Sequence, residues 1–124
     1  MSKKLDYNYC KAAPILEWMS HKWALIVLLR IEEKQQSDTT DIGIRYGELF
    51  RSIPHISEKV LAATLDYLEK EGLIIREEHD GFPPLVQYSL TSLAKAFLLE
   101  ISYVIEWGQL HFEEIMSKRS YGKN

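Results

Sequence analysis

The spacing of the apolar residues changes at Gly72, and this change constrains the fold more than any other feature of the sequence. Before Gly72 the apolar residues recur every three or four positions, which predicts a helix over about residues 57–71. Its buried stripe is expected to be Val60, Leu61, Leu65 and Leu68. After Gly72, residues 73–78 and 85–90 have the apolar, alternating composition of two strands, separated by a loop that contains Gly and Pro. The sequence therefore predicts a helix that leads directly into a β-hairpin.

Both ends of this predicted helix carry residues that favour helix termini. Ser57 can accept a hydrogen bond from a free N–H group of the first turn, and Glu58 complements the positive end of the helix dipole. Gly72 stands where helices commonly end in a left-handed residue. We therefore interpret Ser57 first as a helix cap, with a contact to a phosphate as a second role.

Further helices are predicted on the N-terminal side. A proline in its first turn suits a short helix over residues 14–20. The segment Lys22–Ile31 is apolar on all sides, which fits either a helix packed on most sides or a buried strand, and we favour the helix. Residues 32–41 are polar and predict an exposed loop. Residues 45–52 have helical spacing and end in a turn at Ile53-Pro54-His55.

The C-terminal third predicts one long helix. Thr91 can cap a helix over about residues 92–118, which would be roughly 40 Å long at about 1.5 Å per residue. Between Leu93 and Met116, 15 of 24 residues are apolar, which is more than the buried stripe of a single surface helix requires. We therefore expect part of this helix to pack against a second copy of the chain. The residues predicted at that dimer interface are Leu98, Ile101, Ile105, Trp107 and Phe112.

Together these elements predict a winged helix-turn-helix that is mainly α with a small β-hairpin. The helix-turn-helix would span about residues 45–71, the wing about 73–90 and the dimerisation helix about 92–118, all within a single domain over residues 1–124. In this fold the capped helix enters the major groove of double-stranded DNA, and the hairpin reaches the neighbouring backbone or minor groove. The predicted DNA-binding residues are Lys59 above all, and Ser57, Glu58, Ala62, Ala63, Asp66, Lys22, Arg45, Arg51 and Arg76.

Charge and hydropathy exclude several classes of protein. The net charge of −3 and the pI of about 5.8 argue against a protein that coats nucleic acid without selectivity, because such binding depends on Lys and Arg that neutralise phosphates. The longest apolar run, Trp23–Leu29, has seven residues, whereas a membrane-spanning helix needs about 20. The basic N-terminus is not followed by an apolar stretch of signal-peptide length. We expect a cytoplasmic protein without a membrane partner.

The cysteine and histidine residues do not predict a metal site or an enzyme. Cys10 is the only cysteine, so neither an intrachain disulfide nor a zinc cluster of cysteines is possible. The four histidines have no pair at the i, i+3 or i+4 spacing of metal ligands, and nothing local marks a nucleophile beside a base. We therefore predict no metal, no cofactor and no catalytic residue. Aromatic residues such as Trp18 and Trp23 are expected in the core, with a pocket for a small effector as the alternative.

Several segments carry a family resemblance. They are Cys10 followed by Lys22-Trp23, Arg45–Leu49, Ile56–Leu61, Leu65–Leu73 and Pro83–Thr91. On these segments the chain resembles the HxlR-type transcriptional regulators, dimeric winged-helix proteins close to the MarR type, over about residues 10–110. The resemblance implies a homodimer that binds operator DNA and responds to a chemical signal. It also implies that Cys10 senses oxidants or electrophiles, whereas the residue alone suggests a small, inert apolar filler.

The chain also departs from the pattern of that family. Ala62-Ala63-Thr64 and Leu85 stand where many members have polar or basic residues, and residues 32–42 look like an insertion. These departures reduce direct readout of bases by bidentate side chains. Residues 65–80 also carry six acidic but only two basic side chains. The alternative interpretation is therefore a dimeric winged-helix scaffold for protein contacts or for binding a small effector, with weak or lost DNA binding.

Overall fold

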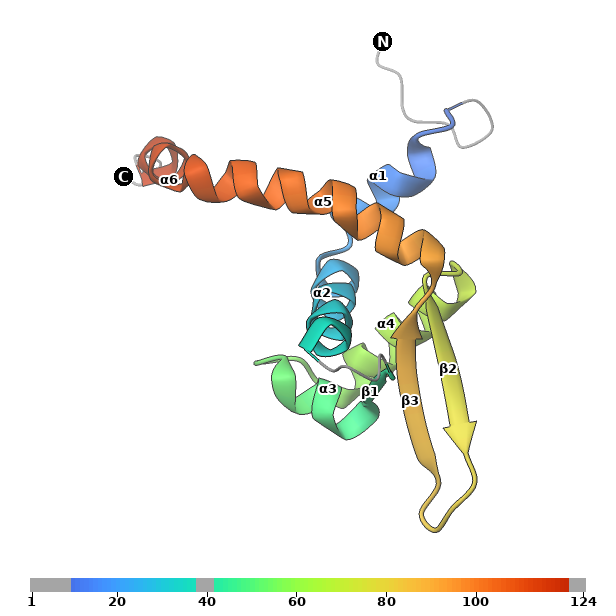
Figure 1. The fold of residues 1–124 in the computed structure, drawn as a ribbon. Helices are drawn as coiled ribbons and strands as arrows, with labels where there is room; N and C mark the ends of the chain where they lie inside the picture. Colours follow the sequence, from blue (N-terminus) through green and yellow to red (C-terminus); the bar gives the residue numbers. More distant parts are fainter. Residues whose placement is uncertain (1–9, 38–41, 121–124) are drawn as a thin grey trace.

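The computed structural model describes residues 10–37 and 42–120, which form a winged helix (Figure 1). The helices are α1 (Ala13–Ser20), α2 (Lys22–Ser37), α3 (Tyr46–Ser52), α4 (Glu58–Lys70), α5 (Ser92–Leu110) and α6 (Phe112–Ser120). The strands are β1 (Ile44–Arg45), β2 (Ile74–His79) and β3 (Leu85–Leu90). The strands form one antiparallel sheet in the order β1-β3-β2. The predicted fold class is therefore confirmed, with one more strand than the sequence predicted.

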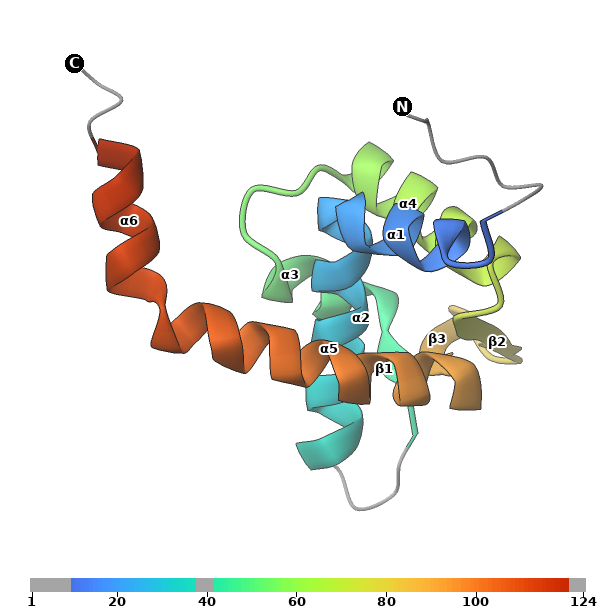
Figure 2. The same ribbon diagram turned by 90° about the horizontal axis from the view of Figure 1, so that it is seen from above.

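Helix α2 runs through the middle of the molecule, beneath α5 and next to α3, α4 and the sheet (Figure 2). Its residues Val27, Leu28 and Ile31 are fully buried in the main hydrophobic core. Leu61 and Leu68 of α4 belong to the same core. Contact on most sides explains why residues 22–31 are apolar all round, and the prediction of a helix rather than a strand is confirmed.

Helix α4 has the two caps that the sequence predicted. The Ser57 hydroxyl accepts a hydrogen bond from the Val60 N–H at 3.1 Å. At the other end, Gly72 has a left-handed φ of 77°, and the Leu73 N–H donates to the Leu68 carbonyl at 3.0 Å. Such a closed terminus satisfies carbonyls that would otherwise lack a partner. The boundaries of α4 are therefore fixed by residues within the helix and next to it.

The prediction that Val60 belongs to the buried stripe of α4 is wrong. Val60 is 37% exposed, whereas Thr64 is buried at 3%. The Thr64 hydroxyl donates to the Val60 carbonyl at 2.8 Å, so burying it leaves no unsatisfied polar atom on that side chain. The buried stripe consists of Leu61, Thr64, Leu65 and Leu68. A threonine can replace an apolar residue in such a stripe because the helix backbone supplies its hydrogen bond.

The predicted loop over residues 32–41 is wrong for the part that the structure describes, because α2 continues to Ser37. Gln35 is buried, and its side-chain carbonyl accepts a hydrogen bond from the Leu90 N–H of β3 at 3.0 Å. The preceding residue, Lys34, forms an ion pair with Glu48 of α3 at 3.1 Å. Contacts with distant segments therefore hold a polar sequence in a helix. Residues 38–41 lie outside the described residues.

Strand β1 was not predicted from the sequence. It is two residues long, and it pairs with β3 so that Ile44 faces Tyr88 and Arg45 faces Gln87. Gly43 precedes it, and a Cβ on Gly43 would collide with the backbone carbonyl of Tyr88. Because the strand is this short, only its pairing with β3 defines it. The wing itself agrees with prediction: β2 and β3 pair from Ile74 opposite Leu90 to His79 opposite Leu85.

The predicted single helix over residues 92–118 is wrong, because it is broken at His111 into α5 and α6. The Nδ1 atom of His111 lies 2.9 Å from the Trp107 carbonyl oxygen, and its ring stacks on the Trp107 ring with 4.3 Å between centroids. These contacts draw the side chain back over the preceding turn and accompany the change of direction seen in Figure 2. No helix in the described ranges is long and apolar enough to cross a membrane.

Hydrogen bonds join the ends of α1, α4 and α5. The Thr91 hydroxyl accepts from the Ala94 N–H at 3.1 Å and donates to the Gly72 carbonyl at 2.8 Å, which confirms Thr91 as the cap of α5. The Trp18 indole N–H donates to Glu71 at 2.7 Å, and its ring meets Phe97 edge-on. The predicted first helix is confirmed as α1. It is held against the end of α4 and the first half of α5.

Candidate nucleic-acid interface

The outer face of α4 offers one free cation and two small apolar side chains. Lys59, Ala62 and Ala63 are all exposed. Among residues 10–37 and 42–120, Lys59 has no ion pair, whereas Asp66 pairs with Lys70 at 2.9 Å. Glu58 and the capping Ser57 lie at the start of the same face. The predicted residues of this helix thus lie together, and the free charge at its N-terminal end is that of Lys59 and Glu58.

The turn between α3 and α4 depends on an unusual backbone conformation. His55 has a φ of 69°, in the left-handed region that residues other than glycine rarely adopt. Ile53 on one side and Ile56 on the other are buried in the core. These two anchors set the direction from which α4 leaves the turn, with its outer face in solvent.

Lys22 lies beside this turn although it precedes it by more than 30 residues in the sequence. Lys22 and Trp23, at the start of α2, line a cavity of about 360 Å³ together with Pro54 and His55. The Lys22 ammonium is 5.1 Å from the centroid of the Trp23 ring, within the range of a cation–π contact. The fold therefore brings this predicted cation next to the helix-turn-helix turn.

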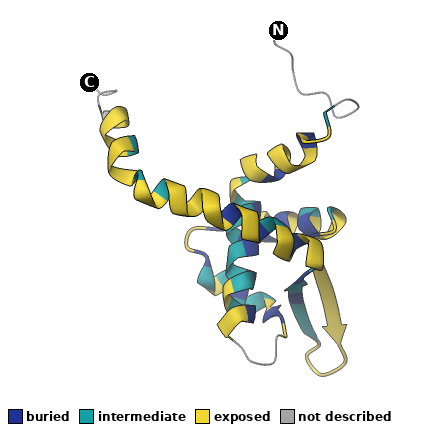
Figure 3. Ribbon diagram, turned by 45° about the horizontal axis from the view of Figure 1, so that its top comes forward, coloured by how far each residue is buried: buried dark blue, intermediate teal, exposed yellow. Residues whose placement is uncertain are grey.

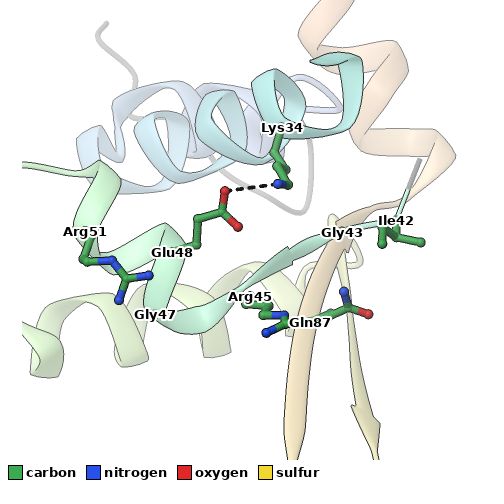
Figure 4. Close-up of a pocket in the computed structure, with 8 residues that line it drawn as sticks. All are labelled: Lys34, Ile42, Gly43, Arg45, Gly47, Glu48, Arg51 and Gln87. Carbon is green, nitrogen blue, oxygen red and sulfur yellow. Dashed lines mark ion pairs between the residues drawn. The ribbon is translucent and has the colours of Figure 1, made fainter. Parts of the chain in front are cut away.

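Arg45 and Arg51 meet at another cavity, of about 460 Å³, between α2, α3 and the sheet (Figure 4). Neither has an ion pair among the residues that the structure describes. Lys34 and Gln87 line the same cavity, and sequence analysis had not selected them. Gln87 could have been selected from the alternation of residues along β3. No local feature of the sequence links Lys34 to Arg45.

Arg76 of β2 is already engaged within the chain. Its guanidinium interacts with the side chain of Tyr88, the residue opposite it in β3, and lies 3.7 Å from Glu78. The hydrogen bond to Tyr88, and after it the charges of Glu78 and Glu69, raise the pKa of the Arg76 guanidinium above its ordinary value. Arg76 lines a hollow of about 150 Å³ with Ala62 and Asp66, so the fold places it next to α4.

The outer part of the wing is acidic and ends in an exposed aromatic ring. Glu77, Glu78 and Asp80 are exposed; Glu78 lies 3.7 Å from Arg76, and Glu77 lies 3.9 Å from His79. Phe82 at the tip is fully exposed. Phosphate groups would be repelled by such a strand unless cations from elsewhere lay between them. The wing therefore differs in charge from the N-terminal end of α4.

Tyr46 lies close to both helices of the helix-turn-helix. It was not among the predicted site residues. It begins α3 and lines the hollow that Ala62 and Arg76 also line. Partial burial, and after it the charge of Glu58, raise the pKa of the Tyr46 hydroxyl above its ordinary value. A neutral hydroxyl is thus available between α3, α4 and the wing.

The apolar residues of α5 and α6 divide into a packed and an exposed group. Leu98 and Ile101, predicted at a dimer interface, lie in the core of the chain at 1% and 5% exposure. Ile105, Trp107 and Phe112 are exposed, and Figure 3 displays the second half of α5 and most of α6 in solvent. Other large apolar side chains are exposed along the same segment, namely Tyr103, Val104, Leu110 and Met116. We call these exposed apolar residues the C-terminal apolar surface. They are Tyr103, Val104, Ile105, Trp107, Leu110, Phe112 and Met116.

Cys10 lies just before α1 and is half-buried. Its carbonyl accepts a hydrogen bond from the Ala13 N–H at 3.1 Å, which connects it to the start of the helix. Within the part of the chain that the structure describes, no three His, Cys, Asp or Glu side chains gather in a way that could hold a metal ion.

Comparison with known proteins assigns the family. The HxlR-like helix-turn-helix family matches residues 18–116, which include every element from α2 to α5 and the start of α6. The chain belongs to this family. It is a transcriptional regulator of the helix-turn-helix type, and the resemblance inferred from the sequence is confirmed. The HTH-type transcriptional regulator YtfH of Escherichia coli is 28% identical over 110 residues, which are 89% of this chain and 81% of that protein.

Solved structures agree with this HxlR-like assignment. A transcriptional regulator of the MarR family from Porphyromonas gingivalis has 34% sequence identity and a TM-score of 0.69, over 86% of this chain and 97% of that one. The redox regulator HypR in its oxidised form has 27% identity and a TM-score of 0.66, over 81% of this chain and 95% of that one. The winged-helix architecture of the chain is therefore that of known regulators.

Proposed function

We propose that this HxlR-like regulator acts as a homodimer that binds specific double-stranded operator DNA. The observation that carries the proposal is the exposed Lys59, without an ion pair among the described residues, in the first turn of α4 directly after the helix-turn-helix turn. In this fold the N-terminal residues of the second helix contact base edges in the major groove. Lys59 would contact a guanine or a phosphate, and the methyl groups of Ala62 and Ala63 would contact thymine methyl groups.

Cations around α4 would position the protein on the DNA backbone. Lys22 beside the turn and Arg51 of α3 are suited to phosphate contacts. Ser57, Glu58 and Asp66 would border the contact, with Ser57 retained as the cap of α4. Arg76 would contribute less, since its guanidinium is already bound to Tyr88 and near Glu78.

The homodimer would form through the C-terminal apolar surface. Large contiguous patches of exposed apolar side chains mark interaction sites in soluble proteins. Ile105, Trp107 and Phe112 would contact the second copy, while Leu98 and Ile101 would support α5 from within the core. Two copies related by a twofold axis would then present two α4 helices to a pseudo-palindromic operator.

Cys10 is proposed as a redox switch of this dimer. It is half-buried next to α1, and one structural neighbour is described as a redox regulator. With peroxide or diamide as the oxidant, the Cys10 thiol would form a disulfide with a thiol of another chain or with a small thiol, because the chain has no second cysteine. DNA binding of the wild type should then respond to diamide, whereas Cys10→Ser should not respond; equal responses of the two proteins would contradict the switch.

The experiment that tests DNA binding is the selection of duplexes from a random pool by the purified chain at ~150 mM salt, in parallel under reducing and oxidising conditions. Enrichment of a pseudo-palindromic sequence is expected under reducing conditions. Its binding should weaken steeply as salt rises, because phosphate contacts release counterions. Failure to enrich any sequence in either condition would overturn the proposal.

A second candidate function rests on the acidic wing. Glu77, Glu78 and Asp80, together with the exposed Phe82, would suit a protein partner better than DNA. In that case the chain would be a winged-helix scaffold with weak or lost DNA binding. The duplex selection separates the two candidates, since a scaffold that has lost DNA binding would enrich no sequence under either condition.

A further inference from the structure

The cavity between α2, α3 and the sheet gathers three cations, of which the proposed DNA contact uses only Arg51. We define the arginine cavity by Lys34, Arg45, Gly47, Glu48, Arg51 and Gln87, which surround about 460 Å³ of space. That volume lies within the range of about 300–1,000 Å³ that is usual for small-molecule sites. It is also larger than a single phosphate or carboxylate group.

Its charges are unbalanced in favour of anions. Lys34, Arg45 and Arg51 are cations, and Glu48 is the one carboxylate among the lining residues. Lys34 forms an ion pair with Glu48 at 3.1 Å, so the carboxylate is already neutralised. The two guanidinium groups have no carboxylate partner among residues 10–37 and 42–120. The lining of the cavity therefore offers an anion two guanidinium groups that no carboxylate neutralises.

Two glycines of this segment allow close contacts around the cavity. Gly47 lies beneath the Arg51 guanidinium (Figure 4), and a Cβ on Gly47 would be 3.3 Å from its Nη1 atom. The absence of a side chain at that position leaves room for the guanidinium against the backbone. Gly43 passes close to Tyr88 in the adjoining strand, which fixes β1 and with it Arg45 opposite Gln87. The amide of Gln87 adds a neutral hydrogen-bonding group beside Arg45.

We propose that the arginine cavity binds a phosphoryl group. Guanidinium groups present paired N–H donors that match the oxygens of phosphate, and these charge-assisted hydrogen bonds are the strong ones. Two sources have this chemistry: a backbone phosphate of the operator, and a phosphorylated small molecule. The site does not depend on DNA binding, and only its occupation by an operator phosphate rests on the proposed function.

The test uses the full chain labelled with ¹⁵N and inorganic phosphate as the probe, at constant ionic strength maintained with chloride. We expect saturable shifts of the backbone amide signals of Gly43 and Gly47, which line the cavity. The double variant Arg45→Gln, Arg51→Gln should bind phosphate about tenfold more weakly, because it loses the charge-assisted hydrogen bonds. Lys118→Gln removes one charge on α6 and should leave the phosphate affinity unchanged.

The variant Glu48→Gln should change the phosphate affinity in the opposite direction. Removing the carboxylate frees Lys34 and should tighten phosphate binding about threefold. A general loss of folding would weaken binding instead, so this variant separates the site from a structural effect. Shifts that do not saturate, or that chloride alone reproduces, would overturn the proposal, as would unchanged affinity in both the arginine double variant and Glu48→Gln.

A second arm identifies the source of the phosphoryl group. If the selected operator duplex shifts the same two amide signals and competes with phosphate, the cavity takes a backbone phosphate. If phosphate binds but the operator leaves both signals in place, the cavity takes a phosphorylated small molecule. Failure of the operator selection would remove the first source but would not change the phosphate titration, so the two proposals fail independently.

Discussion

Helix α4 and the wing adjoin each other yet differ in how their cations are used. Lys59 on α4 is exposed without an ion pair among the described residues, whereas Arg76 on the wing lies opposite Tyr88 and 3.7 Å from Glu78. Around Arg76 the wing also carries Glu77 and Asp80. The two cations therefore enter the proposed DNA contact from different starting states. The state of each cation before binding decides what it can contribute.

The largest difference in operator affinity should appear when Lys59 and Arg76 are each replaced by glutamate. Lys59→Glu is expected to lower operator affinity by about 100-fold, the upper end of the effect of losing one specific contact. Arg76→Glu should lower it less than about tenfold, because that guanidinium already has partners in the free chain. Fluorescence anisotropy with the selected duplex measures both.

The matched control is Lys70→Glu, which makes the same change of charge at the other end of α4. Its loss of affinity should be small, since Lys70 pairs with Asp66 and lies away from the start of the helix. Equal losses for Lys59→Glu and Lys70→Glu would mean that net charge, not the position on α4, controls binding. A larger loss for Arg76→Glu than for Lys59→Glu would reverse the comparison between helix and wing.

Strand β1 connects the wing to the start of α3, and Gly43 is the point at which this connection can be broken. A Cβ there would collide with the Tyr88 carbonyl, which is backbone and can move only with its strand. Gly43→Ala should therefore lower the free energy of unfolding by about 1–3 kcal/mol, the usual cost of overpacking. Urea denaturation monitored by circular dichroism gives the value.

Gly47→Ala serves as the control for Gly43→Ala. The atom nearest its new Cβ is the end of the flexible Arg51 side chain, which can move away. The position is helical, where Ala is favoured over Gly, so no loss of stability is expected. If the two variants lose the same stability, the connection through β1 is not what distinguishes Gly43.

Neutralising two acidic residues of the wing should make the wing more favourable to DNA binding, as the start of α4 is proposed to be. The double variant Glu77→Gln, Glu78→Gln removes two exposed carboxylates near Arg76, and operator affinity should rise about threefold at low salt. The gain should shrink as salt screens the remaining charges. Glu113→Gln with Glu114→Gln on α6 makes the same change of net charge, and we expect no gain there. A similar gain from both pairs would exclude a local effect of the wing.

How far the sequence predicted each region follows from the range of the interactions that define it. The caps of α4 at Ser57 and Gly72 are local, and both were predicted. The last turn of α2 depends on Gln35 bonding to Leu90, 55 residues away, so its polar sequence was misinterpreted as a loop. Strand β1 exists only through its pairing with β3.

The candidate site was predictable to a similar extent. The periodicity of α4 placed Lys59, Ala62 and Ala63 on one exposed face, because three residues of one helix have a fixed relation. The arrangement of Lys34 and Arg45 around one cavity, and of Arg76 opposite Tyr88, requires the packed fold. Hydrophobicity alone likewise could not separate the core residues Leu98 and Ile101 from the exposed Trp107 of the same helix.

The smallest expected effect concerns the turns of the two regions. The helix-turn-helix has His55 at φ 69°, whereas the wing has Gly81 at φ 157°. A left-handed conformation costs a residue with a Cβ about 1 kcal/mol or more, while glycine adopts it freely but loses more entropy on folding. His55→Gly should therefore raise the free energy of unfolding by about 0.5 kcal/mol, the difference between these terms.

Gly81→Ala provides the reciprocal change and should destabilise the wing, since φ 157° is a conformation that residues with a side chain rarely adopt. Urea denaturation of the two variants beside the wild type decides the sign of each change. A loss of stability in His55→Gly would mean that the imidazole itself holds the turn, for example through its place in the cavity that Lys22 and Trp23 line. The turn next to α4 would then be stabilised by a side chain, in contrast to the turn of the wing, which depends on the absence of one.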